Sequence, residues 1–248
     1  MKIHVLLKKE ALDQERLEGK VVIVLDILFA TSSIVTALAH GARDVIPAMD
    51  GGAAKALADV QPAGSYVLSG EMNAITLPGF VHPTPQALLA EGITGRTLIY
   101  STTNGTVALA KSRAAAHVYA GALLNGAAVV EHVVGAHRGD TVLVVCSGSA
   151  DNFNLEDFYG AGHFVALFRR AFAARGIEGE FSDAALAAEL LHDATEARES
   201  LRRARVGRMM LARGLDAEVD FAAQKDIYTV VPALGADGRL RPLAAAQC

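Results

Sequence analysis

The stretch VVIVLDILFATSSIVTALAHGARDVIPA, residues 21–48, decides the fold class. Its first five residues are apolar without alternation, which is typical of a strand buried on both faces. The polar turn Thr31–Ser33 then precedes an alanine- and leucine-rich segment, which favours a helix that serine and threonine cap well. A weaker apolar run over residues 44–47 ends the stretch. We therefore predict a strand–helix–strand unit here.

The same order of elements recurs twice further along the chain. TLIYS, residues 97–101, leads through TTNGT into a helix-forming segment, and TVLVVC, residues 141–146, leads through SGSADN into residues 155–174. This alternation predicts an α/β protein with a layered parallel or mixed sheet and helices on both faces. We expect weaker strands at residues 65–68, 117–120 and 228–231. We also expect two or three helices over residues 183–223, with stops at Gly207 and Gly214.

The chain shows no proline- or serine-rich linker, so we expect a single domain over residues 1–248. Residues 32–48 and 104–122 resemble each other faintly, since both follow the order turn, helix, strand. The alternative that the chain consists of two related βαβ halves is therefore left open, although alanine-rich βαβ units share this order in general.

Composition excludes several classes of protein. The 248 residues are 52% hydrophobic and 20% charged, which suits a packed core and not a disordered chain. With 23 basic and 27 acidic residues the net charge is −4, so no basic surplus serves nucleic acid. No apolar stretch approaches the ~20 residues that a membrane helix needs. Cys146 and Cys248 lie far apart and suggest no disulfide framework, so we expect a cytoplasmic protein, and a homodimer because that assembly is commonest.

Polar clusters follow the three strongest predicted strands. They lie at residues 26–33, 101–106 and 147–151. Ligands of open α/β sheets bind at the carboxyl ends of the strands, and helix N-termini favour anions there. A single cluster is explained by capping of its own helix, whereas three at one edge predict a small anionic, phosphate-like ligand.

Carboxylates accompany these clusters. Asp26 ends a buried strand, where its charge has to be solvated, paired or bound. Glu71 follows another strand-like run, and Glu156 and Asp157 open a helix, a place that acids also favour for the helix dipole alone. Mg²⁺ binds through one or two carboxylates together with a substrate phosphate. A P-loop motif is absent, and Leu28 stands where an aspartyl-phosphate enzyme has its second aspartate.

Residues 21–48, TTNGT at 102–106 and FNLED at 153–157, in this order, resemble the 2-phosphosulfolactate phosphatase (ComB-like) family. The resemblance covers most of the chain and implies a Mg²⁺-dependent phosphatase that acts on a small phosphorylated hydroxy acid. By position in these motifs, and in the segment SGEMNAITLPGF at residues 69–80 that shares the resemblance, we assign catalysis to Asp26 and Asp157, and Mg²⁺ binding to Asp26, Glu71 and Glu156. Substrate binding is assigned to Thr31, Ser32, Thr103, Asn104, Gly105, Thr106 and Ser147.

Two positions depart from the family pattern. Phe29 and Met72 stand where the family has arginine, the natural bidentate partner of phosphate and sulfonate. The substrate is then expected to be less anionic or more apolar, unless Arg43, Arg96 or Lys225 supplies the charge. Two alternatives stay open: a divergent hydrolase or lyase that acts on a different small acid, and a non-catalytic anion binder.

Overall fold

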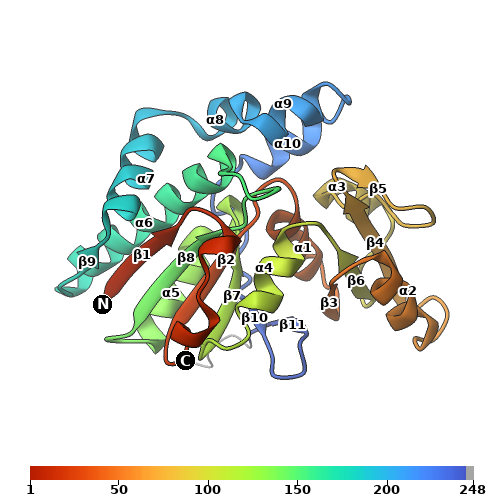
Figure 1. Cartoon of the computed structure of the whole chain (residues 1–248), viewed down its shortest axis with the longest axis horizontal. Coiled ribbons are helices and arrows are strands. Elements are labelled where there is room, and N and C mark those ends of the chain that lie inside the picture. Colours follow the sequence, from red (N-terminus) through yellow and green to blue (C-terminus); the bar gives the residue numbers. More distant parts are fainter. Residues whose placement is uncertain (244–248) are drawn as a thin grey trace.

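The computed structural model describes residues 1–243 and contains one mixed sheet (Figure 1). Its strands are β1 Lys2–Leu6, β2 Val21–Leu25, β3 Asp44–Ala48, β4 Tyr66–Met72, β5 Ile75–Thr76, β6 Thr97–Ser101, β7 His117–Gly121, β8 Thr141–Cys146, β9 Glu180–Phe181, β10 Pro232–Leu234 and β11 Leu240–Pro242. The helices are α1 Ala30–Ala39, α2 Gly51–Asp59, α3 Pro85–Ala90, α4 Gly105–Lys111, α5 Gly126–Ala136, α6 Leu155–Arg175, α7 Asp183–Ala194, α8 Ala197–Arg203, α9 Arg205–Leu211 and α10 Asp216–Ala222.

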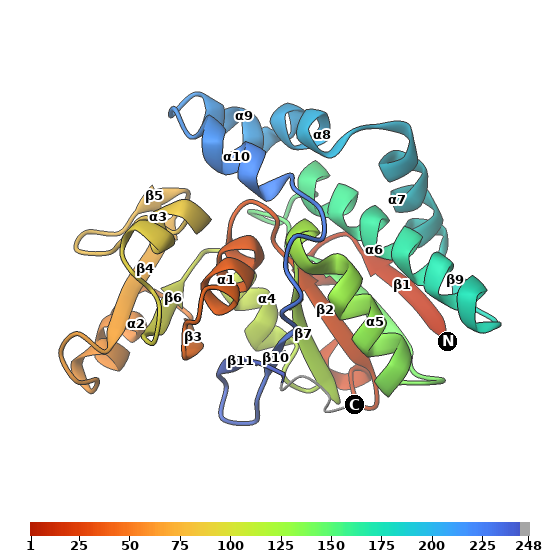
Figure 2. The same cartoon turned by 180° about the vertical axis from the view of Figure 1, so that it is seen from behind.

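The sheet consists of two groups of strands, which are parallel within each group except that β5 pairs antiparallel with β4. Its order is β5-β4-β6-β3-β11-β10-β7-β2-β8-β1-β9. The antiparallel hairpin β10–β11 joins the groups through single residue pairs, Leu240 with Val45 and Ala233 with Tyr119. Helices α1 and α4 lie between the groups in both views (Figures 1 and 2), because each connects a strand of one group to a strand of the other.

Strand β2 has helices on both of its faces, as predicted. Val21, Ile23 and Leu25 pack into a core cluster with α5 and α6. Val22 and Val24 point the other way, into a cluster with α1 and α4. All five side chains are fully buried, which explains why the sequence shows no alternation here. The predicted α/β class with a mixed sheet is confirmed; the single domain and the related halves stay predictions.

Most of the predicted strands are present. Strands β6 and β8 have the predicted bounds, and β2, β3, β4 and β7 differ only at their ends. The strand predicted over residues 228–231 is wrong, since the chain there has no regular structure and β10 begins at Pro232. The N-terminal strand β1, which pairs in parallel with β8, was not predicted from the sequence.

The helical region after residue 182 contains four helices, where two or three were expected. Gly214 separates α9 from α10 and has a φ of 72°, which favours glycine, so this predicted stop is confirmed. Gly207 is not a stop and lies inside α9. A Cβ atom there would collide with the backbone carbonyl of Leu201, so glycine lets α9 approach the end of α8 closely.

Two further expectations concern single features. Cys146 is a buried free thiol in β8, and Cys248 lies outside the described residues. Over residues 1–243, no helix combines the length and apolar character needed to cross a membrane.

Candidate functional site

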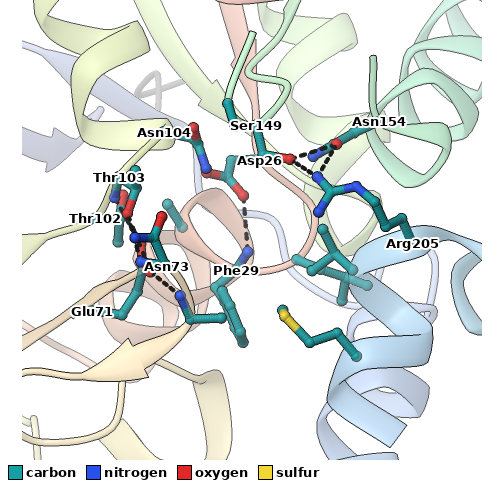
Figure 3. Close-up of a pocket in the computed structure, with 16 residues that line it drawn as sticks. Asp26, Phe29, Glu71, Asn73, Thr102, Thr103, Asn104, Ser149, Asn154 and Arg205 are labelled. Carbon is teal, nitrogen blue, oxygen red and sulfur yellow. Dashed lines mark hydrogen bonds between the residues drawn. The ribbon is translucent and has the colours of Figure 1, made fainter. Parts of the chain in front are cut away.

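The turns that follow β2, β6 and β8 meet at one edge of the sheet and line a cavity of about 260 Å³ (Figure 3). The β4–β5 hairpin and α9 complete its wall. The lining residues are Asp26, Leu28, Phe29, Ala30, Glu71, Asn73, Ala74, Thr102, Thr103, Asn104, Ser149, Ala150, Asn154, Arg205, Val206 and Met209. The structure therefore brings together the three polar turns that the sequence places at strand ends.

Asp26 is fixed at this edge by its own turn. Its Oδ1 atom accepts a hydrogen bond of 2.8 Å from the Phe29 N–H. Its N–H donates to Thr31 Oγ1 at 2.9 Å, and that hydroxyl donates back to the Asp26 carbonyl at 3.0 Å. Burial raises the pKa of Asp26 to about 6, with the charge of Glu71 adding to the rise and nearby N–H groups and Lys9 opposing it. The carboxyl is therefore mostly ionised at neutral pH and able to accept a proton.

Glu71 ties the β4–β5 hairpin to the turn after β6. Its Oε1 accepts from the Thr103 N–H at 2.7 Å, and its Oε2 accepts from the Ala74 N–H at 2.5 Å. Asn73 and Ala74 have φ values of 53° and 58°, the left-handed pair of a type I′ hairpin turn. The Asn73 N–H also donates to Thr103 Oγ1, at 3.2 Å. Glu71 thus lines the cavity with both oxygens already accepting hydrogen bonds.

Glu156 and Asp157 are buried in the first turn of α6 and do not line the cavity. Asp157 accepts from the Ile27 N–H at 2.9 Å and from the Gly148 N–H at 3.0 Å, so it joins two of the turns. Burial raises its pKa, and the charges of Asp26 and Glu156 add to the rise. Within residues 1–243, the carboxyl oxygens of Glu156 have no hydrogen-bond partner. Burial raises the pKa of Glu156 to about 7.

Three of the predicted substrate-binding hydroxyls serve the backbone instead. Thr31 bonds to Asp26, as described above. Ser32 Oγ donates to the Ile27 carbonyl at 2.8 Å, and Thr106 Oγ1 donates to the Thr102 carbonyl at 2.8 Å. None of the three lines the cavity. These side chains fit the capping interpretation of each cluster and not direct ligand binding.

Of the other predicted substrate-binding residues, two line the cavity and two do not. Thr103 and Asn104 line the cavity. Gly105 lies behind it, where a Cβ atom would come within 2.6 Å of Asp26 Oδ2, so the glycine permits close packing of α4 on the acid. Ser147 is fully buried and lies outside the lining.

Lys9 is a buried cation that the sequence analysis missed. Its Nζ donates to Asn104 Oδ1 at 3.0 Å and to the Ser147 carbonyl at 3.3 Å, and it pairs with Glu10 at 2.9 Å. An ammonium group can only donate, so Lys9 fixes the oxygen branch of the Asn104 amide. The nitrogen branch of that amide is then the donor left for the cavity. No local sequence pattern marks Lys9 as a site residue, because the two groups that it binds at the strand edge, in Asn104 and Ser147, lie 95 and 138 residues away.

Arg205 is the other residue that the sequence analysis missed. It projects from α9, and its guanidinium donates to Ser149 Oγ and, at 3.3 Å, to Asn154 Oδ1 (Figure 3). It is the one Lys or Arg side chain among the lining residues that the structure describes. The sequence cannot show which face of α9 turns toward the strand edge, so nothing distinguishes Arg205 from the neighbouring arginines.

The three cations suggested as substitutes for the missing arginines lie elsewhere. Arg43 donates to Thr97, Arg96 to the Tyr66 carbonyl, and Lys225 to His192. None of these cations lines the cavity. Arg205 therefore supplies the positive charge that was expected from them.

The two departures from the family pattern differ in position. Phe29 lines the cavity beside Asp26. Met72 is 55% exposed and lies in a separate groove with Leu77 and Phe80. Phe29 alone therefore changes the wall of this cavity.

Mg²⁺ fits the site only as an ion shared with a substrate. No group of three or more His, Cys, Asp or Glu side chains in residues 1–243 is arranged to hold a metal. Asp26 and Glu71 both line the cavity, and one or two carboxylates suffice when a phosphate completes the coordination. The mutual repulsion of these two acids is a further reason why a cation suits them. Glu156, the third predicted ligand, lies outside the lining.

Comparison with known proteins identifies the family. The family model described as 2-phosphosulpholactate phosphatase matches residues 6–237. This chain belongs to the 2-phosphosulfolactate phosphatase family. A relative from Carboxydothermus hydrogenoformans, named a probable 2-phosphosulfolactate phosphatase, is 34% identical over 233 residues, 94% of this chain and 92% of its own. A relative of the same name from Clostridium tetani is 29% identical over 234 residues, 94% of this chain and 97% of its own.

A third relative, from Thermotoga maritima and also named a probable 2-phosphosulfolactate phosphatase, is 32% identical over 222 residues, 88% of this chain and 90% of its own. The similarity to the 2-phosphosulfolactate phosphatase family therefore spans the strand-edge turns, the hairpin and α9 together. The motifs that suggested this family from sequence, TTNGT and FNLED, contribute Thr102, Thr103, Asn104 and Asn154 to the cavity.

Proposed function

We propose that the protein is a phosphatase that hydrolyses a small phosphorylated hydroxy acid of the 2-phosphosulfolactate type. Family membership supports the reaction. One observation connects the reaction to a particular residue. The buried carboxyl of Asp26 has a pKa raised to about 6 and lies at the edge of a cavity lined by polar turns. A general base works best when its pKa lies near the working pH.

The chain's own residues account for the hydrolysis as follows. The phosphoryl oxygens accept hydrogen bonds from Asn104 and from N–H groups of the turns, which stabilises the charge that they carry in the transition state. Asp26 accepts a hydrogen bond from the attacking water and takes its proton. A bond forms between the water oxygen and phosphorus, and the bond from phosphorus to the ester oxygen breaks. The leaving alkoxide takes a proton from solvent water and Asp26 returns its proton to solvent, which gives the hydroxy acid and inorganic phosphate.

Asp157 has a supporting part in this proposal. Both of its oxygens accept N–H groups of the turns after β2 and β8, so it holds the turn that carries Asp26. Mg²⁺ would be held by Asp26 and Glu71. When bound, it would neutralise charge on the phosphate.

The cytoplasmic location and the homodimer remain predictions. Light scattering would measure the mass of the protein in solution and so test the homodimer.

Phosphate release from a panel of esters tests the proposal. The panel contains 2-phosphosulfolactate, 2-phospholactate, phosphoglycolate and an aryl phosphate, each with Mg²⁺ and with EDTA. We expect release that depends on Mg²⁺. Phosphate release that persists in EDTA would exclude a requirement for Mg²⁺. If the folded protein released phosphate from no ester of the panel, the proposed phosphatase activity would be wrong.

Phe29 in the cavity wall favours a second candidate, a family member that binds a small acid without this reaction. A non-catalytic anion binder is stabilised against unfolding by its ligand yet releases no phosphate. A different hydrolase or lyase turns over non-phosphorylated acids. A thermal-shift and turnover screen with lactate, 3-sulfolactate and related acids separates these candidates from the phosphatase.

A further inference from the structure

The positive charge of Arg205 has no carboxylate partner. Over residues 1–243, no Asp or Glu oxygen lies within 4.0 Å of its guanidinium, whose acceptors are the neutral oxygens of Ser149 and Asn154. Arg198 and Arg202 on the adjacent α8 instead both pair with Asp220. Arg205 therefore faces the cavity without a salt bridge, although its charge also acts on the buried carboxyl of Glu156, whereas Arg198 and Arg202 form salt bridges within the fold.

Apart from Ser149 and Asn154, which bind Arg205, part of the wall near this residue is apolar. Val206 and Met209 from α9 line the same cavity, together with Leu28 and Phe29 from the turn after β2. These four side chains offer no hydrogen-bond donor to an anion. The acids Asp26 and Glu71 repel any anionic group that is not compensated by a cation or by N–H donors.

The charges of the cavity limit the charges of its substrate. A phosphate monoester carries about two negative charges at neutral pH, and the proposed function places it on the turns beside Asp26. A further acid group on the substrate binds best beside a cation, and among the described lining residues Arg205 is the one Lys or Arg side chain. The planar guanidinium suits a carboxylate, which it can bind through two parallel hydrogen bonds.

We propose that Arg205 binds the one acid group that the substrate carries besides its phosphate, and that the apolar wall excludes a second. This inference rests on the proposed function and narrows it. The preferred substrate is then a phosphorylated monocarboxylic hydroxy acid such as 2-phospholactate. 2-Phosphosulfolactate, which carries both a carboxylate and a sulfonate, is a poorer substrate of this protein.

Three esters with related carbon skeletons test the proposal: 2-phospholactate, 2-phosphosulfolactate and isopropyl phosphate, which has no acid group. For the wild type we expect the highest kcat/KM on 2-phospholactate. Arg205→Met should lower kcat/KM on 2-phospholactate by roughly 10- to 100-fold, mainly through KM, because a charge-assisted hydrogen bond is lost. It should leave isopropyl phosphate within about twofold, since that ester never used Arg205.

Arg208→Met is the matched control, because Arg208 lies on the same helix, is exposed and donates to the Arg203 carbonyl. We expect it to change none of the three rates. An equal loss on all three esters with Arg205→Met would make Arg205 a structural residue and overturn the inference. So would no loss at all, or a wild-type preference for 2-phosphosulfolactate.

Binding of unphosphorylated acids keeps the inference distinct from the proposed function. Lactate should raise the Tm of the wild type and of Arg208→Met, and not that of Arg205→Met. If no ester is hydrolysed while this pattern appears, the phosphatase is wrong and the anion site at Arg205 stands. If lactate and 3-sulfolactate shift no Tm, or shift wild type and Arg205→Met alike, the anion site is wrong.

Discussion

Asp26 owes its chemistry to the point at which β2 ends. The five residues before it are fully buried, so the carboxyl leaves the core at the edge of the cavity and keeps only 7% of its surface exposed. Burial favours the neutral acid, while the N–H groups of its own turn favour the carboxylate. The balance leaves a group that is ionised at neutral pH and still basic enough to accept a proton.

Asp26→Asn should abolish this function. We expect kcat to fall by ~10³-fold, within the range that a lost general base costs. The fold should persist, because the asparagine oxygen can still accept from the Phe29 N–H. Phosphate release and the Tm measure the two effects, with the exposed Asp59→Asn as a control that changes neither. A variant that keeps more than a tenth of wild-type kcat would remove Asp26 from the mechanism.

Lys9→Met tests whether Lys9 positions Asn104. Methionine keeps the apolar stem but leaves Asn104 Oδ1 without the ammonium donor, while the Ser147 carbonyl keeps only the Lys9 backbone N–H. We expect a loss of about 1–3 kcal/mol in the free energy of unfolding. We also expect kcat to fall about 10-fold with little change in KM, because the amide loses its fixed orientation.

Two further variants complete this test. Lys8→Met removes only the contacts of an exposed ammonium with the carboxylate and carbonyl of Asp151, so it should leave both the free energy of unfolding and kcat nearly unchanged. Asn104→Ala should lower kcat by itself, and adding Lys9→Met to it should lower kcat no further. Additive losses in the double variant would show that Lys9 does not act through Asn104.

At the scale of elements, the site depends on how closely α4 approaches α1. Both helices connect the two groups of strands, and both begin beside Asp26. Gly105 at the start of α4 packs against Ala30 at the start of α1 and against the Asp26 side chain. The small residue at this point therefore sets the position of the Asp26 carboxylate.

Gly105→Ala should disturb both stability and activity. The new Cβ atom would lie 2.6 Å from Asp26 Oδ2, so either the helix or the acid has to move. We expect a loss of about 1–3 kcal/mol in urea unfolding and at least a tenfold loss of kcat. Gly135→Ala is the matched control, since a Cβ atom there, in α5, meets nothing within 4 Å. That variant should gain about 0.5–1 kcal/mol and keep its activity; identical behaviour of the two variants would contradict the packing argument.

At the scale of the whole molecule, the buried acids make stability depend on pH. The pKa of Glu156 is raised to about 7 in the folded protein, above its usual value of 4.5, because the group is buried. The folded state therefore binds the proton more tightly than the unfolded state. This contribution to stability is fully present below about pH 4.5 and is lost as the pH rises through about 7.

Glu156→Gln isolates this contribution from the histidines, whose pKa values are lowered by burial and act in the opposite sense. Measured in EDTA, the free energy of unfolding of the variant relative to the wild type should rise by roughly 3 kcal/mol between pH 4 and pH 8, since one pKa unit corresponds to about 1.4 kcal/mol. Urea titrations at these two pH values give the difference. A constant difference would show that Glu156 does not hold a proton in the folded protein.

The sequence by itself determined the fold class, most of the strands and the edge at which the polar turns meet. Uninterrupted apolar runs identify buried strands, and parallel strands bring the turns at their carboxyl ends to one edge whatever the order of the sheet. Asp26, Glu71, Thr103 and Asn104 could therefore be placed at the cavity in advance.

Only the tertiary structure decided which polar groups remain for a ligand. The hydroxyls of Thr31, Ser32 and Thr106 donate hydrogen bonds to nearby backbone carbonyls. The Asp157 carboxylate accepts a hydrogen bond from the N–H of Ile27, which lies 130 residues earlier in the chain. Arg205 enters the cavity because α9 packs over the strand edge, near a turn 56 residues earlier in the chain. Such contacts join segments far apart in sequence, and no local pattern encodes them, because a side chain's partners depend on how whole elements pack.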